Sequence, residues 1–371
     1  MDTKKRQFIS DYLETFRNIF SNTDIHCNLN AFADICRDVK LRGNKLIFAG
    51  NGASASIASH AATDFTQHAR VRSICFNDHN LITCFGNDYG YENWIWNALE
   101  AYADPGDVVV LISSSGCSLN IINAAKFAKD KYLKVVTFSG FSPDNPLQQI
   151  GDLNLWVASS AYNIVEATHL IWILSVANIL EQGGNSKTFL IDYFARQQQA
   201  LFETNYSNEL IHFMELCCAV SNRNGKIIFA GNGGSSSIAS HAATDFTKQS
   251  KIRSVAFNDH NLISAYSNDY GQDRWIAQCI DDYADPKDAV VLISCSGQSK
   301  NVITAANIAK EKGLHVVTFT GFKPDNTLRS SGDLNFWVNS QNYNITESTH
   351  TILIFCIGDM RADENRYLDT K

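Results

Sequence analysis

The sequence predicts an α/β protein built from two doubly wound parallel-sheet domains. The first observation is an internal repeat: residues 45–52 (KLIFAGNG) return as 226–233 (KIIFAGNG), and residues 56–66 (SIASHAATDFT) return unchanged as 237–247. Both pairs are offset by 181 residues, and the same offset relates Glu166 to Glu347. Self-similarity at a fixed period is the signature of duplicated structural units. The chain is therefore a tandem duplication.

The second observation is the alternation of short apolar runs with amphipathic segments inside each copy. Nearly all-apolar strands alternating with helices indicate a parallel sheet covered on both faces, the three-layer arrangement of a flavodoxin-like domain. Two helical segments precede the first strand as an N-terminal extension. Strands are expected at 46–49, 73–76, 108–112, 135–138 and 153–157, and helices at 6–20, 28–40, 57–65, 120–129 and 163–180. The first domain is expected at 1–181 and the second at 187–360, with a flexible linker at 182–186 and a polar tail at 361–371.

The composition excludes several classes of function. The 371 residues are 45% hydrophobic and 19% charged, with a net charge of -7, which argues against a nucleic-acid binder. No apolar run is expected to cross a bilayer, and the N-terminus lacks the pattern of a signal peptide. Of ten cysteines, only Cys36 has a counterpart in the other copy, Cys217. Because a disulfide framework would recur in both copies, we expect reduced thiols in a cytoplasmic protein.

Two loops are expected at the carboxyl ends of strands, where ligands bind in such sheets. One is the loop at 50–56, in which glycines permit tight turns and Asn51 and the serines, including Ser54, offer hydrogen bonds. The other is the serine-rich loop at 113–118, matched at 294–299. Hydroxyls and N–H groups at a helix N-terminus can bind an anion without Arg or Lys, although ordinary Gly/Ser turns with N-caps are the alternative. Neither loop has the spacing of a dinucleotide or nucleoside triphosphate motif, so a phosphorylated polyol is favoured.

Two residue pairs could carry chemistry. His60 and Asp64 are four apart on one helix face, which suits two metal ligands or an acid–base pair, but also a surface ion pair or a core histidine. Glu166 and His169 are three apart, and a carboxylate in a cleft suits proton transfer between sugar carbons. Asn163 and Glu166 also fit a capping box. Turn formation is expected to explain the polar clusters at 77–80 and 87–90.

The motifs at 50–65, 87–90, 113–120 and 165–169, taken together, resemble the SIS (sugar isomerase) family, and specifically its phosphoheptose isomerase branch. The resemblance covers nearly all of both copies. It implies that the serine-rich loop holds the phosphate and that the asparagine of the glycine loop contacts the sugar. The implied substrate-binding residues are Asn51, Ser54, Ser113, Ser115 and Ser118, with their counterparts Asn232, Ser235, Ser294, Ser296 and Ser299.

The resemblance also implies a zinc site, formed by a His and an acidic residue on the first sheet helix and by a Gln or Glu and a His on the last helix. The matching residues are His60, Asp64 and Glu166, and in the second copy His241, Asp245 and Glu347. Asp64 and Asp245 stand where Glu is usual, and Leu174 and Phe355 stand where the final His is expected. The implied site lacks one ligand and would hold zinc weakly at most.

We therefore expect an aldose–ketose isomerase of a sugar phosphate, with a heptose phosphate favoured. Glu166 and Glu347 would move the proton through an enediol, assisted by His169 and His350 or by the His–Asp pairs. The alternatives are a non-catalytic sugar-phosphate sensor or assembly protein with a degenerate metal site, and an enzyme of amino-sugar phosphates. The resembled isomerases form oligomers, so two chains are expected to associate into a homodimer of four domains.

Overall fold

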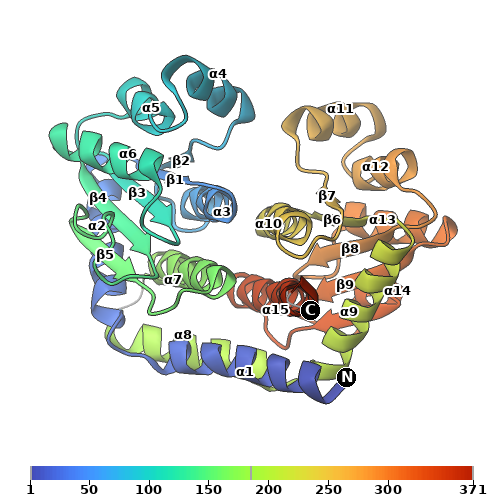
Figure 1. Ribbon diagram of the computed structural model, residues 1–371. Coiled ribbons are helices and arrows are strands. Elements are labelled where there is room, and N and C mark those ends of the chain that lie inside the picture. Colours follow the sequence, from blue (N-terminus) through green and yellow to red (C-terminus); the bar gives the residue numbers. More distant parts are fainter. Residues whose placement is uncertain (1, 184–185, 370–371) are drawn as a thin grey trace. The chain divides into compact units, whose positions relative to one another are not determined.

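The computed structural model describes residues 2–183 and 186–369, which form two compact units. The first unit is Ile19–Ala195, and the second unit combines Met1–Asn18 with Arg196–Lys371. Each unit contains one five-stranded sheet in which every neighbouring pair of strands is parallel. The predicted fold class is confirmed, since both units are parallel sheets flanked by helices (Figure 1).

The strand order is the same in both units. It is β2-β1-β3-β4-β5 in the first and, read in the same direction, β7-β6-β8-β9-β10 in the second. From β1 the chain first moves to β2 on one side and then returns past β1 to β3 on the other side. This change of direction is the doubly wound topology. The strands are β1 (Leu46–Gly50), β2 (Ser73–Cys75), β3 (Val108–Ser113), β4 (Lys134–Ser139) and β5 (Leu153–Trp156), then β6 (Ile227–Gly231), β7 (Ser254–Ala256), β8 (Ala289–Ser294), β9 (His315–Thr320) and β10 (Leu334–Trp337).

Helices cover both faces of each sheet. In the first unit α2 (His26–Arg42), α3 (Ala53–Gln67) and α7 (Tyr162–Gln182) cover one face. The other face is covered by α4 (His79–Tyr89), α5 (Trp94–Tyr102) and α6 (Leu119–Asp130). In the second unit the corresponding helices are α9 (Ser207–Asn222), α10 (Gly234–Lys248) and α15 (Tyr343–Asp369) on one face, and α11 (His260–Tyr270), α12 (Trp275–Tyr283), α13 (Lys300–Glu311) and the short α14 (Thr327–Ser331) on the other.

The strands divide their side chains between two core layers, because successive residues of a strand point to opposite faces. Ile47 and Ala49 of β1 belong to the layer beneath α5 and α6, where Trp94 is 1% exposed. Phe48 points to the opposite layer, where its ring packs on Phe65 at a centroid distance of 5.5 Å. All five residues of β1 are buried. A strand buried on both faces must be apolar throughout, which explains the continuous apolar runs of the sequence.

The two repeats exchange most of their N-terminal helices. Helix α1 (Asp2–Ser21) contributes residues 2–18 to the second unit, where the Arg6 guanidinium donates to Asn208 of α9 over 2.6 Å. The first part of α8 (Ser186–Phe202) belongs to the first unit, where the Phe194 ring stacks on His26 of α2 at 5.4 Å. The extension expected for each repeat therefore packs on the body of the other repeat. The predicted bounds 1–181 and 187–360 follow the sequence repeat. The compact units are divided near residues 18 and 195 instead.

Several local expectations were wrong. Helix α4 occupies the segment where turns were expected, and α5 follows it. Helix α15 continues to Asp369, through most of the expected polar tail at 361–371. The expected linker is shorter than predicted, because α7 runs through Gln182 and α8 begins at Ser186; residues 184–185 of the linker lie outside the described residues.

Helix α7 is long and apolar enough to cross a membrane by length and composition, contrary to the expectation that no such run exists. Within the first unit, however, 94% of that stretch is buried. A helix that is apolar all round is either a core helix or a membrane span, and its burial here makes α7 a core helix.

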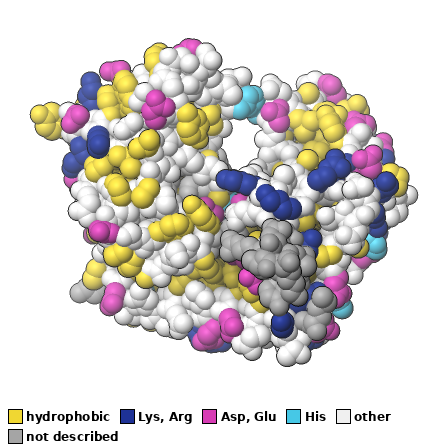
Figure 2. Space-filling view, in the orientation of Figure 1, with side chains coloured by type: hydrophobic (Ala, Val, Ile, Leu, Met, Phe, Trp, Pro, Cys, Tyr) yellow, Lys and Arg dark blue, Asp and Glu magenta, His cyan; other side chains and the backbone are white. Residues whose placement is uncertain are grey.

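On the face shown in Figure 2, basic and acidic side chains are interspersed over the surface.

Candidate functional site

The strand order brings two predicted loops together. In each unit the glycine loop follows β1 or β6 and the serine-rich loop follows the neighbouring strand, β3 or β8. This is the position at which the direction of the chain crossings changes, and ligands of doubly wound sheets bind there. Gly50 allows the helix to begin close to the strand, because a Cβ at this position would lie 2.5 Å from the Ser54 backbone. The topology therefore confirms that the two loops are adjacent.

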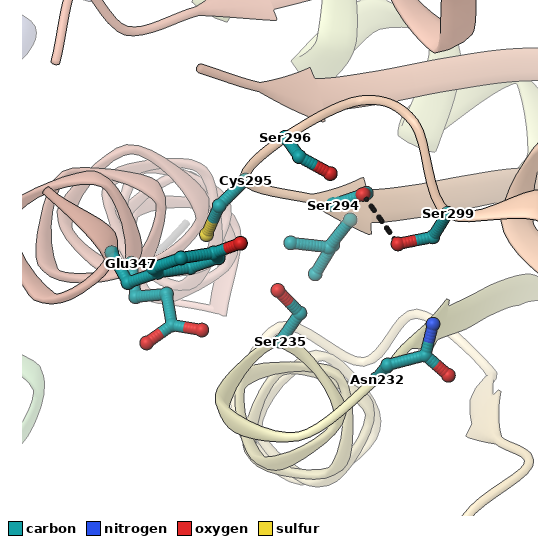
Figure 3. Close-up of a pocket in the computed structure, with 9 residues that line it drawn as sticks. Asn232, Ser235, Ser294, Cys295, Ser296, Ser299 and Glu347 are labelled. Carbon is teal, nitrogen blue, oxygen red and sulfur yellow. Dashed lines mark hydrogen bonds between the residues drawn. The ribbon is translucent and has the colours of Figure 1, made fainter. Parts of the chain in front are cut away.

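A cavity of about 120 Å³ lies between these loops in the second unit (Figure 3). Six of its lining residues were predicted from the sequence, and none of the nine described lining residues is Lys or Arg. Three lining residues were missed: Ile293, Cys295 and Tyr343. The six predicted lining residues are Asn232, Ser235, Ser294, Ser296, Ser299 and Glu347.

The serine-rich loop is held in a shape that presents hydroxyls and a helix N-terminus. Ser294 Oγ and Ser299 Oγ are hydrogen-bonded at 3.1 Å, and Ser299 precedes α13 without capping it through its side chain. The backbone N–H of Gln298 donates to Ser296 Oγ over 3.2 Å. Gly297 has a φ of 61°, and a Cβ there would overlap the side chain of buried Asn326. Because the first N–H groups of a helix have no acceptor within it, this loop can bind an anion through dipoles alone.

The first unit repeats this loop. Ser113 Oγ donates to Ser118 Oγ over 3.2 Å, and the N–H of Cys117 donates to Ser115 Oγ over 3.2 Å. Ser54, like its counterpart Ser235, is 3% exposed in the first turn of its helix.

The asparagine of each glycine loop is paired with a second asparagine that the sequence interpretation missed. The amides of Asn232 and Asn301 donate to each other over 3.0 and 2.9 Å, and Asn51 pairs with Asn120 in the same way. The Tyr91 hydroxyl also donates to Asn51 Oδ1 over 2.9 Å. Asn120 and Asn301 close the repeated serine motif, so their recurrence was an available signal. The pairs link the two loops and orient the amide groups.

The predicted base lies against the serine-rich loop. In the first unit Ser114 Oγ donates to Glu166 Oε1 over 3.0 Å, and the two residues are only 5% and 6% exposed. The capping-box alternative is wrong, because α7 begins at Tyr162 with Ala161 as its N-cap. Glu166 therefore lies inside the helix and contacts the loop after β3, which is the placement expected of a functional carboxylate.

In the second unit Cys295 replaces Ser114. Its thiol lies beside Glu347 and Ser235, and burial raises the pKa of the thiol well above its usual range. A protonated thiol is a weaker hydrogen-bond donor than a hydroxyl. The two copies therefore support their glutamates by different groups.

The His–Asp pairs are buried. His60 Nε2 lies 3.8 Å from Asp64 Oδ1, and His241 Nε2 lies 3.3 Å from Asp245 Oδ2. All four residues are at most 5% exposed, so the surface ion-pair alternative is wrong.

The residues of a unit do not fit the zinc site implied by the resemblance. Protein-bound zinc takes three or four side-chain ligands, and among the described residues no three candidate ligand atoms of a single unit lie within 4.8 Å of one another. The position expected to hold the final histidine is Phe355, whose ring centroid is 4.1 Å from that of His241. Leu174 is fully buried at the matching position of the first unit. Both positions carry a side chain that cannot bind a metal.

His169 and His350, which were expected to assist the proton transfer, lie in the core of their units. Both are fully buried, with Nε2 lying 3.0 Å from the backbone oxygen of Ser139 or Thr320 at the end of β4 or β9. Burial lowers the pKa of each imidazole to about 4. A carbonyl accepts only from a protonated Nε2, so each ring is neutral with Nδ1 unprotonated. His350 does not line the cavity, and both histidines hold strand ends in the core.

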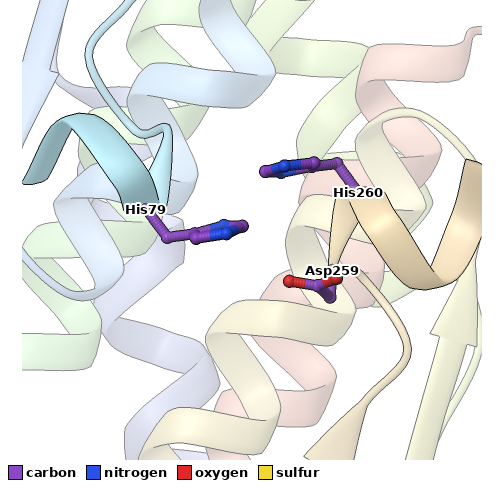
Figure 4. Close-up of side chains that lie close together, drawn as sticks. All are labelled: His79, Asp259 and His260. Carbon is purple, nitrogen blue, oxygen red and sulfur yellow. The ribbon is translucent and has the colours of Figure 1, made fainter. Parts of the chain in front are cut away.

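The polar clusters expected to form turns instead begin and end helices. Asp78 caps α4 by accepting from the Leu81 N–H over 3.1 Å, and Asn87 and Asp88 lie in the last turn of that helix. In the second unit Asp259 caps α11, and His260 is the first residue of that helix (Figure 4). His79 opens α4 in the same way, and both histidines are exposed.

Comparison with known families agrees with this geometry. The model of the SIS domain matches residues 11–140 and 191–321, which together are more than half of the chain. The chain belongs to the SIS domain family. The two matched segments fall in the two repeats, so each repeat is an SIS domain.

Individual relatives match a single repeat's length. A phosphoheptose isomerase of Akkermansia muciniphila is 31% identical over 149 residues, which are 38% of this chain and 78% of that protein. Phosphoheptose isomerase 2 of Campylobacter jejuni is 33% identical over 159 residues, which are 41% of this chain and 78% of that protein.

Solved structures match both repeats together. The C-terminal domain of glucosamine-fructose-6-phosphate aminotransferase from Francisella tularensis has a TM-score of 0.63 at 13% identity and covers 96% of this chain and 94% of its own. Glucosamine-6-phosphate deaminase from Thermotoga maritima has a TM-score of 0.57 at 11% identity, and the match covers 95% of this chain and 94% of that protein's chain. At such low identity these likenesses establish the fold of a double SIS protein.

Proposed function

We propose that the chain is an aldose–ketose isomerase of a sugar phosphate. The observation that carries the proposal is the cavity of the second unit, which is lined by both the serine-rich loop and Glu347 (Figure 3). In one small cavity, an anion site can bind the phosphate and a carboxylate can act as the base of this reaction. The Ser114–Glu166 hydrogen bond places the same groups together in the first unit.

The chemistry follows from this arrangement. The phosphate binds to the hydroxyls of the serine-rich loop and to the N-terminus of α13, so the carbon chain extends toward Glu347. The carboxylate removes the proton from the hydroxyl-bearing carbon next to the carbonyl. The electron pair of the broken C–H bond forms a C=C bond, and the carbonyl π pair moves onto the carbonyl oxygen, which takes the proton of the neighbouring hydroxyl to give the enediol form. The same carboxyl group then returns a proton to the former carbonyl carbon. The carbonyl moves by one carbon and no net oxidation or reduction occurs.

The relatives support a narrower choice of substrate. Two proteins named phosphoheptose isomerase are 31% and 33% identical to this chain over 149 and 159 residues, a stretch shorter than one repeat. We therefore propose a seven-carbon sugar phosphate as the substrate. We also propose that two chains associate into a homodimer, for which light scattering should give twice the mass of one chain.

The first experiment tests the base. The double variant Glu166→Gln with Glu347→Gln should abolish isomerisation and leave sugar-phosphate affinity within about twofold, because the amide keeps the shape of the carboxylate but cannot accept the proton. Thermal shift with a panel of sugar phosphates identifies ligands, and NMR in D₂O then measures exchange of the proton next to the carbonyl. Glu181→Gln, at the exposed far end of α7, is the matched control. Full exchange in the double variant would contradict the proposed base.

A second candidate is a non-catalytic sugar-phosphate sensor. It is favoured by Leu174 and Phe355, which stand where the resemblance implies a metal ligand, and by the packing of the Phe355 ring on His241. Isomerases need a group that stabilises the negative charge of the enediolate, and the implied zinc would do so. Wild-type protein that binds sugar phosphates but shows neither turnover nor proton exchange would establish the sensor in place of the enzyme.

A further inference from the structure

A half-exposed tyrosine stands at the edge of each candidate site. Tyr343 lines the cavity of the second unit and is 51% exposed, and Tyr162 is 51% exposed at the matching position of the first unit. Each tyrosine is the first residue of its helix and precedes the glutamate by four residues. Residues four apart lie on one face of a helix. The tyrosine therefore lies one helical turn before the glutamate, on the same face of the helix.

Each tyrosine is held by a phenylalanine in an unusual backbone conformation. Phe322 has a φ of 57° and Phe141 a φ of 59°, which is uncommon for a bulky residue. The ring of Phe322 meets that of Tyr343 edge-on at 4.9 Å and 69°, and Phe141 meets Tyr162 at 4.9 Å and 67°. Edge-to-face pairs at this separation are favourable beyond simple burial. The same geometry occurs in both repeats.

The surrounding loops impose this conformation. The N–H of Gly321 donates to the Cys295 carbonyl over 2.8 Å, and the N–H of Phe322 donates to the Ser340 carbonyl over 3.0 Å. A Cβ on Gly321 would lie 2.6 Å from a methyl group of Thr346. The segment is thus fixed between the serine-rich loop and α15. Strain of this kind persists where the surroundings over-determine it, and it is concentrated at functional sites.

We propose that Tyr343 and Tyr162 are substrate-binding residues, positioned by Phe322 and Phe141. This inference rests on the proposed function. The ring would cover the C–H face of the carbon chain beyond the phosphate, and the hydroxyl would bind a sugar hydroxyl. Packing does not require either ring, since half of each remains exposed. The tyrosines thus select a phosphate ester that carries a polyhydroxylated chain over phosphate itself.

The experiment compares two ligands. Calorimetry of the Tyr162→Ala, Tyr343→Ala double variant should show an affinity for inorganic phosphate within about twofold of wild type, and an affinity for the best sugar phosphate of the panel that falls about fivefold to tenfold. The double Tyr→Phe variant should retain the contribution of the rings and lose that of the hydroxyls. Tyr132→Gly is the control, because Tyr132 is 96% exposed and its repeat counterpart is Gly313.

A second variant tests the positioning role. Glycine adopts a positive φ readily, so Phe141→Gly with Phe322→Gly removes the rings while allowing the same backbone conformation. We expect a smaller loss of sugar-phosphate affinity, about threefold, with phosphate binding unchanged. Equal losses for both ligands, or no loss for either, in the Tyr→Ala variant would overturn the inference. Wild-type protein that binds phosphate but no sugar phosphate would instead contradict the proposed function.

Discussion

In the last helix of each repeat, a buried glutamate and a buried histidine three residues apart have different surroundings. Glu166 and Glu347 contact or line the sites at the strand ends, whereas His169 and His350, three residues later, bond to backbone carbonyls in the core. A neutral imidazole in this position satisfies a carbonyl at the end of a strand next to the site. Its contribution to folding therefore depends on remaining unprotonated.

The histidines predict a stability that falls in mild acid. The pKa of His350 is about 4 in the folded protein, against an ordinary 6.5, so between these values the unfolded chain binds more protons and stability rises with pH. The stabilisation is complete above pH 6.5 and is lost progressively toward pH 4, by about 2 kcal/mol per histidine at pH 5. Urea unfolding at pH 7.5 and 5 measures this difference.

The variant His350→Gln isolates the effect, because the Gln amide can still donate to Thr320 but does not titrate in this range. Its loss of stability between pH 7.5 and 5 should be smaller than that of wild type by about 2 kcal/mol. An unchanged pH dependence would show that folding does not lower the pKa of His350.

At the scale of elements, an ion pair fixes the strand ends that lie away from the ligand site. Lys45 precedes β1 and Asp107 precedes the neighbouring β3; Lys45 Nζ lies 2.5 Å from Asp107 Oδ2, and the Lys45 N–H donates to Asp107 Oδ1 over 3.0 Å. Lys226 and Asp288 repeat the pair at 2.5 Å in the second unit. The adjacent carboxyl ends of these strands carry the ligand loops, so the pair holds the scaffold without contacting the site.

Asp107→Asn should lower the free energy of unfolding by about 3 kcal/mol, because it leaves a largely buried lysine without its main counter-charge. Phosphate and sugar-phosphate affinities should not change, since the pair lies at the opposite end of the sheet. Asp104→Asn is the control: its carboxylate also contacts Lys45, at 2.6 Å, but its side chain is 75% exposed, so the loss should be under about 1 kcal/mol. Denaturant unfolding measures the stability of the two variants, and calorimetry measures their ligand affinities. Equal losses of stability would contradict the view that Asp107 is the main counter-charge of Lys45.

At the scale of the whole molecule, the exchanged helices α1 and α8 tie the folding of the two repeats together. Residues 2–18 of α1 complete the second unit, where Phe16 is fully buried and the Arg17 guanidinium lies 3.8 Å from the Phe202 ring centroid. The first repeat thus supplies a helix that packs on the body of the second repeat. Neither repeat is a complete folding unit by its sequence bounds alone.

Phe16→Ala should therefore loosen the second unit, although it lies in the first repeat. Replacing a buried Phe by Ala leaves a cavity and lowers the free energy of unfolding by about 3–5 kcal/mol. Hydrogen exchange should accelerate in α9 while α2 remains protected, and the exposed Gln7→Ala should change neither. Faster exchange in α2 with α9 unchanged would show that α1 serves its own repeat.

The sequence alone determined the duplication, the alternation of strands and helices, the adjacency of the two loops and six residues of the cavity. These features are encoded locally: repeats need no structure to be recognised, and strands buried on both faces must be apolar throughout. Loop positions follow from them, because the strand order of a doubly wound sheet brings successive carboxyl ends together. The serines were predicted from the repeated loop at the end of a strand, and the glutamates from their spacing to a histidine and from the family resemblance.

Only the tertiary structure decided which polar residues of one helix face the site. Glu166 and His169 share a helix face by spacing, and α7 is buried on all sides, so no polar stripe shows which of them points into the core. Packing against β4 turns His169 inward and leaves Glu166 at the loop after β3. Three other features depend in the same way on contacts between segments that are distant in the sequence, and spacing along the chain does not encode such contacts. They are the position of Tyr343 at the cavity, the Asn232–Asn301 pair, and the exchange of α1 and α8.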